Sequence, residues 1–294
     1  MIERFDHAVI GIPDLEDGIA AFRRLGFEVS EGGRHPSLGT RNAIVRFGLD
    51  YLELLSVEDA RTAQARGPFG SDLLSFLRES SGLVGFVLAG SRLEEHADAF
   101  RSLGIGAEGP FEMDRIRPDG RRLEWRLVVP GGSPWRKPWP YLIDWITPES
   151  DLLAWDPPGD HRCGVTGVAG MDLVAEDLGA AREIYQTALG LRHRMTPPSP
   201  GETGTTSFYL QIGSFSLGLH QPTGDGAARR ELDRRGPGPF RLLLSSPDLA
   251  YSAATLSTLD IPFSMTHQCL DIDRDASAGA RIRIVPVQGQ GATT

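Results

Sequence analysis

The chain has 294 residues, a hydrophobic content of 40% and a formal net charge of −9 at pH 7. The negative charge disfavours a nucleic-acid partner, because phosphate binding needs clustered Lys and Arg. No apolar run approaches the roughly 20 residues of a membrane span, and the two cysteines indicate neither a disulfide framework nor a zinc knuckle. Because no signal-peptide pattern precedes the first strand, we expect a cytoplasmic protein of about two domains, without a membrane partner.

The first segment of regular structure is a strand at residues 6–12, which is apolar after its first two residues, Asp6 and His7. A helix is predicted over residues 14–25, because its apolar side chains recur at i, i+3 and i+4. Gly26 stands at the left-handed cap position. Three more strands, at residues 27–30, 42–47 and 50–55, complete a β-α-β-β-β unit.

The same strand–helix signal recurs three more times along the chain. The repeats are at residues 83–88 and 93–103, at 168–174 and 177–189, and at 240–244 and 248–259. One unit alone exposes an apolar face, so the units are expected to pair. We therefore predict an α+β fold of four β-α-β-β-β units, paired into two cupped mixed-sheet domains with helices outside. A stretch rich in Pro and acidic residues separates them, which gives domains at 1–148 and 164–294 and a linker at 149–163.

Two residues of the first unit are candidate functional groups from their local sequence. Glu53 has two apolar residues on each side, which favours a buried and partnered carboxylate over a solvated one. His35 follows the second predicted strand in a loop flanked by glycines. It is either an exposed loop histidine or a functional group, as a metal ligand or as a general base near neutral pH.

The second unit supplies the candidate substrate-binding residues. Arg126 shares a strand face with Glu124. It either pairs with that carboxylate or, if the face lines a cavity, binds a substrate carboxylate or enolate through two parallel hydrogen bonds. Arg117 begins a turn. Trp125 is either a core residue or a platform for a ligand. With Asp144, these residues form the predicted substrate-binding set: Arg117, Trp125, Arg126 and Asp144.

The order of elements, with His7 on the first strand and Glu53 on the last, resembles the vicinal oxygen chelate superfamily of glyoxalase, bleomycin-resistance and extradiol dioxygenase relatives. The first half is most similar to its glyoxalase-like domain branch. The matching segments are Gly32–Pro36, Gly39–Asn42, Tyr51–Leu55, Arg115–Gly120, Leu123–Arg126 and Trp139–Trp145. The resemblance implies that His7 and Glu53 face each other and hold a divalent metal ion. Nitrogen and oxygen donors suit Fe, Mn, Ni or Zn rather than Ca.

The chain departs from the metal-binding members of that superfamily at the other ligand positions. The residues aligned with His7 in the other three units are Gly85, Gly170 and Arg241. The position of Glu53 is taken by Gly218 in the third unit and by Ile143 or Asp144 in the second, according to a one-residue register. Asp144 or His35 would complete the site. The alternative is a buried His7–Glu53 hydrogen bond that only orders the strands, and the C-terminal half is expected to be structural.

These observations lead to an expected function for residues 1–148. We expect a small-molecule enzyme of the glyoxalase-like class, of lyase, isomerase or dioxygenase type, with His7 and Glu53 as metal ligands and His35 as the catalytic base. The alternative is a metal-free protein that binds a small molecule or sequesters an antibiotic, because the usual set of four ligands is incomplete. A homodimer is compatible with either function.

Overall fold

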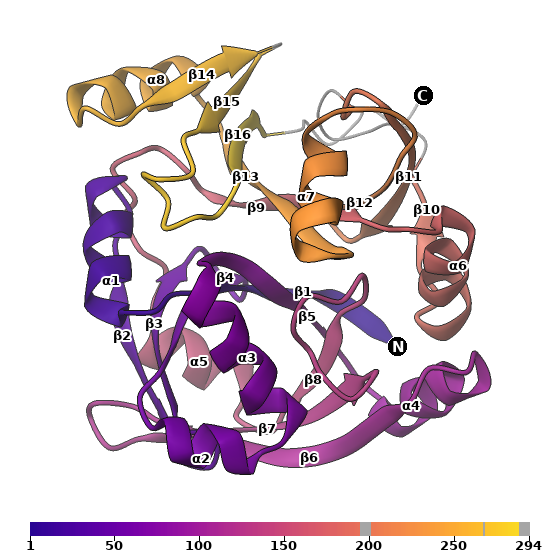
Figure 1. The fold of residues 1–294 in the computed structure, drawn as a ribbon. Helices are drawn as coiled ribbons and strands as arrows, with labels where there is room; N and C mark the ends of the chain where they lie inside the picture. The colour runs from indigo at the N-terminus through magenta and orange to yellow at the C-terminus, as the bar shows by residue number, and fades with distance from the viewer. Residues whose placement is uncertain (195–200, 267, 288–294) are drawn as a thin grey trace.

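The computed structural model describes residues 1–194, 201–266 and 268–287. The first half forms an eight-stranded sheet that closes into a barrel (Figure 1). Its first unit consists of β1 (Ile2–Gly11), α1 (Leu15–Arg24), β2 (Ser30–His35), β3 (Thr40–Arg46) and β4 (Tyr51–Val57). Its second unit consists of β5 (Gly82–Gly90), α4 (Leu93–Ser102), β6 (Ala107–Ile116), β7 (Arg122–Pro130) and β8 (Tyr141–Trp145).

The second half forms another mixed sheet of eight strands, which stays open. Its first unit consists of β9 (Gly167–Val174), α6 (Leu178–Glu183), a π-helical turn (Ile184–Ala188), β10 (Arg192–His193), β11 (Thr205–Ile212) and β12 (Phe215–Pro222). Its second unit consists of β13 (Gly238–Ser246), α8 (Leu249–Thr258), β14 (Phe263–Thr266), β15 (Cys269–Ile272) and β16 (Ile282–Pro286). The predicted α+β fold of four repeated units in two mixed sheets is thus confirmed.

The repeated unit brings the first and last strands of each unit together. In the first unit β1 runs parallel to β4, with His7 opposite Tyr51 and Val9 opposite Glu53. The first strands of the two units, β1 and β5, pair antiparallel in the middle of the sheet. The first sheet is cupped so strongly that it closes, because β2 and β6 pair at Arg34 and Ile116.

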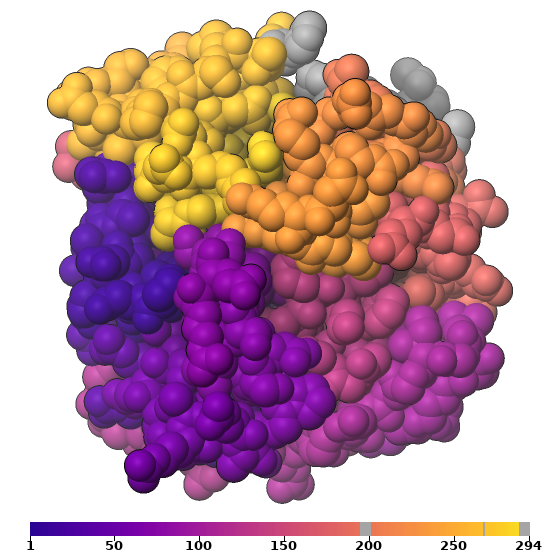
Figure 2. All heavy atoms as spheres, in the orientation of Figure 1, coloured from indigo at the N-terminus to yellow at the C-terminus, as the bar shows by residue number. Residues whose placement is uncertain are grey.

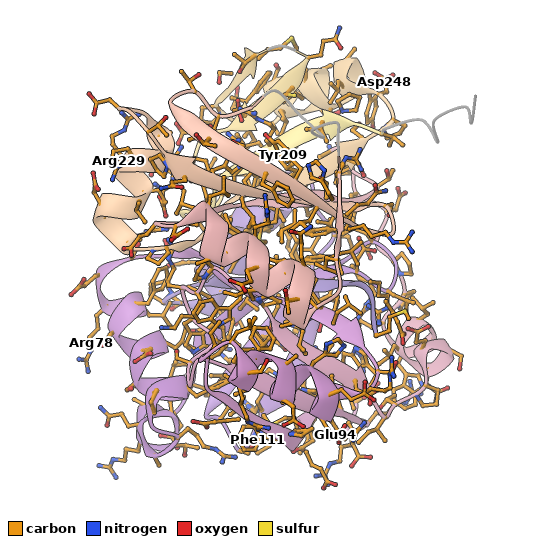
Figure 3. All side chains as sticks on the ribbon, turned by 90° about the vertical axis from the view of Figure 1, so that its right-hand side faces the viewer. Arg78, Glu94, Phe111, Tyr209, Arg229 and Asp248 are labelled. Carbon is orange, nitrogen blue, oxygen red and sulfur yellow. The ribbon has the colours of Figure 1, made fainter. Side chains whose placement is uncertain are left out.

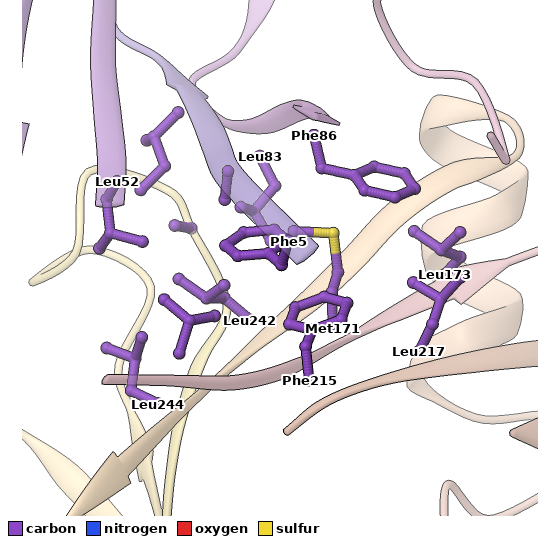
Figure 4. Close-up of a cluster of buried hydrophobic side chains, with 14 of the residues drawn as sticks. Phe5, Leu52, Leu83, Phe86, Met171, Leu173, Phe215, Leu217, Leu242 and Leu244 are labelled. Atoms are coloured by element: carbon purple, nitrogen blue, oxygen red, sulfur yellow. The ribbon is translucent and has the colours of Figure 1, made fainter. Parts of the chain in front are cut away.

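Successive side chains of β1 point alternately into the core between the two sheets and into the barrel. Ala8 and Ile10 point into the core between the two sheets, whereas Val9 points into the barrel, as the period of two in a strand requires. The inter-sheet core is continuous across both halves. Its centre contains a stacked pair, Phe5 and Phe215, whose ring centroids lie 4.3 Å apart (Figure 4). The two halves are in direct contact along the face that Figure 2 shows.

The first unit also differs from the prediction in the place of its second strand. The strand lies at Ser30–His35 instead of residues 27–30, so His35 ends a strand and is not in a loop. Gly32 and Gly33 suggested a loop, but in the structure both lie within β2. A Cβ on Gly32 would lie 2.1 Å from the Asn42 side chain, and Gly33 has a φ of 138° at an irregularity of the β2–β3 pairing.

Four helices lie outside the predicted units. They are α2 (Ala60–Ala65), α3 (Pro68–Glu79), α5 (Glu149–Trp155) and α7 (Ala227–Arg235). α2 and α3 lie across the front of the barrel in Figure 1, and α5 forms at the start of the predicted linker. No helix in the described ranges combines the length and apolar character that crossing a membrane requires.

Candidate active site

A cavity with about 560 Å³ of free space, including its opening to solvent, lies inside the barrel. Its polar lining comes mostly from β1, β2, β3, β4 and β6, and its aromatic lining comes largely from β4, β7 and β8. The lining residues are His7, His35, Leu38, Thr40, Asn42, Tyr51, Glu53, Leu55, Phe69, Met113, Arg115, Trp125, Leu127, Trp135, Tyr141, Ile143 and Trp145. The cavity therefore combines a few polar groups with a large apolar surface, as small-molecule sites do.

His7 is held in one orientation by the residue before it. Its Nδ1 lies 2.7 Å from Oδ1 of Asp6, whose carboxylate also accepts hydrogen bonds from Arg4 and from Nε1 of Trp145, at 2.7 and 2.9 Å. Burial would raise the pKa of Asp6, but the hydrogen bond and charge of His7 and the charge of Arg4 lower it to about 2. An anionic Asp6 accepts from Nδ1–H, so Nε2 of His7 faces the cavity.

Glu53 lies directly opposite that nitrogen. Its Oε2 is 3.5 Å from His7 Nε2, and its Oε1 accepts a hydrogen bond of 2.5 Å from Nδ2 of Asn42. Burial would raise the pKa of Glu53, but His7, His35 and Asn42 lower it to about 2. Burial would lower the pKa of His7, but hydrogen bonds to Asp6 and Glu53 raise it overall. The structure thus brings together the nitrogen and oxygen donors of the predicted metal-ligand pair.

His35 completes a group of three side chains around the Glu53 carboxylate. Its Nε2 lies 3.9 Å from Oε1 of Glu53, and its Nδ1 lies 3.0 Å from the Thr40 hydroxyl. The side chain is buried, unlike an exposed loop histidine. Burial, with the positive charges of Arg115 and His7, lowers the pKa of His35 to about 4. It is therefore neutral at pH 7 and a weaker base than the near-neutral one expected from the sequence.

Only Trp125 of the predicted substrate-binding residues lines the cavity. Arg126 is the next residue on β7 and points outward, where it forms ion pairs with Asp144 and with Glu94. Figure 3 places Glu94 at the surface of the barrel. The register at β8 resolves the alternative left by the sequence, because Ile143 lines the cavity and Asp144 lies opposite Arg126 on the other face.

Arg117 also stays outside the cavity. Its guanidinium donates to the Trp155 carbonyl at 2.6 Å and lies near Asp119 and Asp156. It stands after the end of β6, beside the turn that the sequence indicated. None of Arg117, Arg126 and Asp144 therefore lines the cavity in which the sequence analysis expected them to bind a substrate.

Arg115 is the charged residue of the cavity lining that the sequence analysis did not select. It is 3% exposed, and its Nε and Nη2 have no hydrogen-bond partner. Burial lowers its pKa, against the attraction of Tyr51, Asp156 and Glu53. Its register was available from the sequence, since Met113 and Arg115 are two residues apart on β6 and so share the face that Met113 buries.

The donor set fits a cation in part. Within residues 1–194, 201–266 and 268–287, no three His, Cys, Asp or Glu side chains converge closely enough to hold a metal ion as placed. Two ligands of one ion with bonds of ~2.1 Å lie roughly 3.0–3.4 Å apart. The separations of 3.5 Å from His7 to Glu53 and 3.9 Å from His35 to Glu53 are only slightly longer. His7 and Glu53 thus lie close to the spacing of two ligands of one ion, and His35 lies on the other carboxylate oxygen of Glu53.

The second sheet contains a different polar cluster. Gly170 and Gly218 occupy the positions of His7 and Glu53, as predicted. The next inward positions carry Asp172 and His220, whose Oδ1 and Nε2 lie 3.1 Å apart, at ion-pair distance without hydrogen-bond geometry. The two equivalent positions thus lack donor atoms, and the polar cluster lies one step of the strand alternation away from them.

Arg241 joins this cluster from β13. It donates to Oδ2 of Asp172 through Nε and Nη2, at 2.9 and 2.7 Å, and through Nη1 to Glu202 at 3.0 Å. His220 is bonded through Nδ1 to the Ser207 hydroxyl at 2.8 Å. Burial would raise the pKa of Asp172, but Arg241 and His220 hold it well below its usual range. The cluster thus consists of groups that neutralise one another.

Comparison with protein families gives a match over most of this architecture. Residues 5–190 match the model of the glyoxalase-like domain family. The match contains the whole barrel and continues through β9 and α6, past the boundary at 148 that the sequence suggested. Among curated proteins, none matches this sequence significantly.

Solved structures with the same fold include members of the vicinal oxygen chelate superfamily. A hypothetical protein from Staphylococcus aureus has a TM-score of 0.67 at 15% identity, with 97% of this chain and 100% of that chain covered. A variant of 4-hydroxymandelate synthase from Streptomyces coelicolor has a TM-score of 0.61 at 12% identity, with 99% and 95% covered. At these identities the likeness shows the fold alone.

Proposed function

The chain belongs to the glyoxalase-like domain family, and on that premise we propose that its barrel is a small-molecule enzyme site that uses a divalent metal ion. The functional domain in this proposal is residues 1–148, with the second sheet supporting it by packing. The observation that carries the proposal is the convergence of His7, Glu53 and His35 on one side of a cavity lined by aromatic residues.

The proposal assigns His7 and Glu53 as metal ligands. Asp6 holds the proton of His7 on Nδ1, which leaves Nε2 free to donate its lone pair once its own proton is displaced. Glu53 stays anionic well below neutral pH because its pKa is about 2. Asn42 fixes one carboxylate oxygen and leaves the other toward His7.

His35 is assigned as the third ligand instead of the general base. A neutral imidazole is the form that binds a metal, and a pKa of about 4 keeps His35 in that form. Two histidines and one carboxylate suit Fe, Mn, Ni or Zn. When bound, such an ion acts as a Lewis acid on substrate oxygens. The apolar lining around Trp125 and Tyr141 excludes water and positions the rest of the substrate.

The test is metal binding by the purified, chelator-treated protein. Mn²⁺ titration followed by calorimetry should show one site per chain, and His7→Ala and Glu53→Ala should each abolish it without unfolding the protein. His220→Ala is the matched control, because it removes a buried histidine from the other sheet and should leave Mn²⁺ binding unchanged. Retention of Mn²⁺ binding in the first two variants would contradict a metal site in the barrel. Loss of binding only in the His220→Ala control would instead indicate a site in the second sheet.

The second candidate function is metal-free binding of a small molecule. The observation that favours it is the separation of the donors, since no three of them converge closely enough as placed in the described residues. Under this function His7 and Glu53 form an ion pair that orders β1 and β4. The same titration decides, because a protein of this kind shows no saturable site for Mn²⁺ or Zn²⁺ and still binds a ligand in the cavity.

A further inference from the structure

We propose that the barrel cavity binds a carboxylate joined to an apolar, ring-bearing body, and that Arg115 is the residue that binds the carboxylate. This inference rests on the proposed function in one respect, that the cavity is the substrate site. It adds the chemical class of the substrate, which the description of the family does not specify.

The first argument is that the Arg115 guanidinium has no partner in the protein. In the described part of the chain no hydrogen bond or ion pair engages its side chain, although it is only 3% exposed. By contrast, the buried Arg241 has Asp172 and Glu202 as counterions. An unpaired buried charge costs stability, so a position that keeps one is typical of a ligand-binding group.

The second argument is the charge of the cavity wall. Its acidic and basic residues are Glu53, His7, His35 and Arg115. Glu53 has its counterion in His7, at 3.5 Å, whereas Arg115 forms no ion pair within the described residues. Arg115 therefore leaves one positive charge uncompensated, and a bound divalent ion would add to it. The site attracts an anion in either state.

The third argument is the shape of the two binding surfaces. A guanidinium offers parallel N–H donors in a plane, which match the two oxygens of a carboxylate. The remaining wall is apolar, with six aromatic side chains: Tyr51, Phe69, Trp125, Trp135, Tyr141 and Trp145. This combination fits a molecule with one carboxylate and an apolar body of ring size.

The experiment compares benzoate with benzamide, which has nearly the same shape without the charge. Binding is followed by calorimetry and by fluorescence of the cavity tryptophans. The wild-type protein should bind benzoate at least ~10-fold more tightly than benzamide. Arg115→Met should remove that preference by weakening benzoate binding at least ~10-fold, while benzamide binding stays unchanged. Arg126→Gln is the control, because Arg126 pairs with Asp144 outside the barrel.

Thermal unfolding separates a binding role from a structural one. Because Arg115 has no hydrogen-bond or ion-pair partner among the described residues, Arg115→Met should unfold at the same or a higher temperature than wild type. Arg115→Lys keeps the positive charge but lacks the parallel N–H donors of the guanidinium. It should therefore retain part of the preference for benzoate over benzamide. Equal binding of benzoate and benzamide by wild type, or an unchanged preference in Arg115→Met, would overturn the inference.

The measurements are made on chelator-treated protein and again with added Mn²⁺, so that the two proposals fail separately. Arg115-dependent binding of benzoate without any Mn²⁺ site would reject the metal-dependent enzyme and support this inference. The opposite result would be a Mn²⁺ site that depends on His7 and Glu53, together with a benzoate affinity that is unchanged in Arg115→Met. It would reject this inference and support the enzyme proposal.

Discussion

The barrel and the open sheet each contain a buried arginine, but the two arginines differ in their partners. In the barrel, Arg115 has no hydrogen-bond partner in the part of the chain that the structure describes, and it lines a cavity with His7 and Glu53. In the open sheet, Arg241 binds Asp172 through two nitrogens and Glu202 through a third. The barrel thus leaves the charge of Arg115 available to a ligand, whereas the open sheet neutralises the charge of Arg241 with its own carboxylates.

This difference indicates how buried polar groups in duplicated units can be distinguished. A buried arginine whose donors are all directed at protein carboxylates contributes to the folded state, and its removal leaves unpaired charges behind. A buried arginine without a partner lowers stability and is explained by a ligand. The same amino acid is thus structural in one sheet and a candidate for binding in the other, and stability measurements can test that contrast.

The largest expected effect is on the stability of the open sheet. Arg241→Met should lower the free energy of unfolding by about 3–5 kcal/mol, because it leaves Asp172 and Glu202 buried without their counterion. Urea denaturation at neutral pH measures it, with Arg115→Met as the matched variant from the barrel. If both substitutions destabilise the protein equally, the contrast between the two halves is wrong.

The next effect concerns the position that corresponds to Glu53. In Gly218→Ala the new Cβ would lie 2.5 Å from Asp172 Oδ1 and 2.8 Å from His220 Nε2. We expect a loss of about 1–3 kcal/mol in the free energy of unfolding, because the cluster must shift to admit a methyl group. Gly224→Ala, where no heavy atom lies within 4 Å of the new Cβ, is the control in the same denaturation experiment. Equal stability of the two variants would show that the cluster is loosely packed.

A further test compares the carboxylates that orient the two histidines. Asp6→Asn keeps the shape of the side chain but removes the charge that holds Nδ1–H of His7. Mn²⁺ affinity should fall by about 10–100-fold, as for other residues that orient a metal-binding histidine. Calorimetric titration measures it. Asp172→Asn makes the same change beside His220 and should leave the affinity for Mn²⁺ unchanged, so an equal fall in both variants would contradict the assignment.

The smallest expected effect lies at the junction of the two halves. His161 accepts a hydrogen bond from the Glu28 amide through Nδ1, at 3.1 Å, and its Nε2 lies 3.1 Å from the Arg46 carbonyl. This pattern requires the neutral ring, and burial lowers the pKa of His161 below 6.5. The unfolded chain therefore binds a proton at a higher pH than the folded chain, and stability falls as the pH drops below about 6.5.

His161→Gln tests this pH dependence, because glutamine cannot be protonated. Urea denaturation at about pH 7 and about pH 5 should show a smaller loss of stability in the variant than in the wild type. A loss of the same size in both proteins would mean that other groups determine the acid response of the junction.

The local sequence predicted the fold well. Helical spacing of apolar residues and short alternating strands identified all four units, and glycines cap the first three helices, because each signal depends on neighbours within a few residues. The proximity of His7 and Glu53 was predicted from the resemblance to the superfamily. The helices α2 and α3 were missed, because they belong to no repeated unit.

The identity of the cavity residues was decided by tertiary structure. Arg115, Arg117 and Arg126 lie within twelve positions of one another, but a strand turns alternate side chains to opposite faces, and only Arg115 enters the barrel. The partner that fixes Asp6 is equally remote, because Trp145 reaches it from 139 residues away. The sequence by itself determined the units, through short-range periodicity, and the donor pair, through the resemblance to the superfamily. Strand register and barrel closure decided which charges meet, which stay unpaired and which face solvent, because these depend on contacts between distant segments.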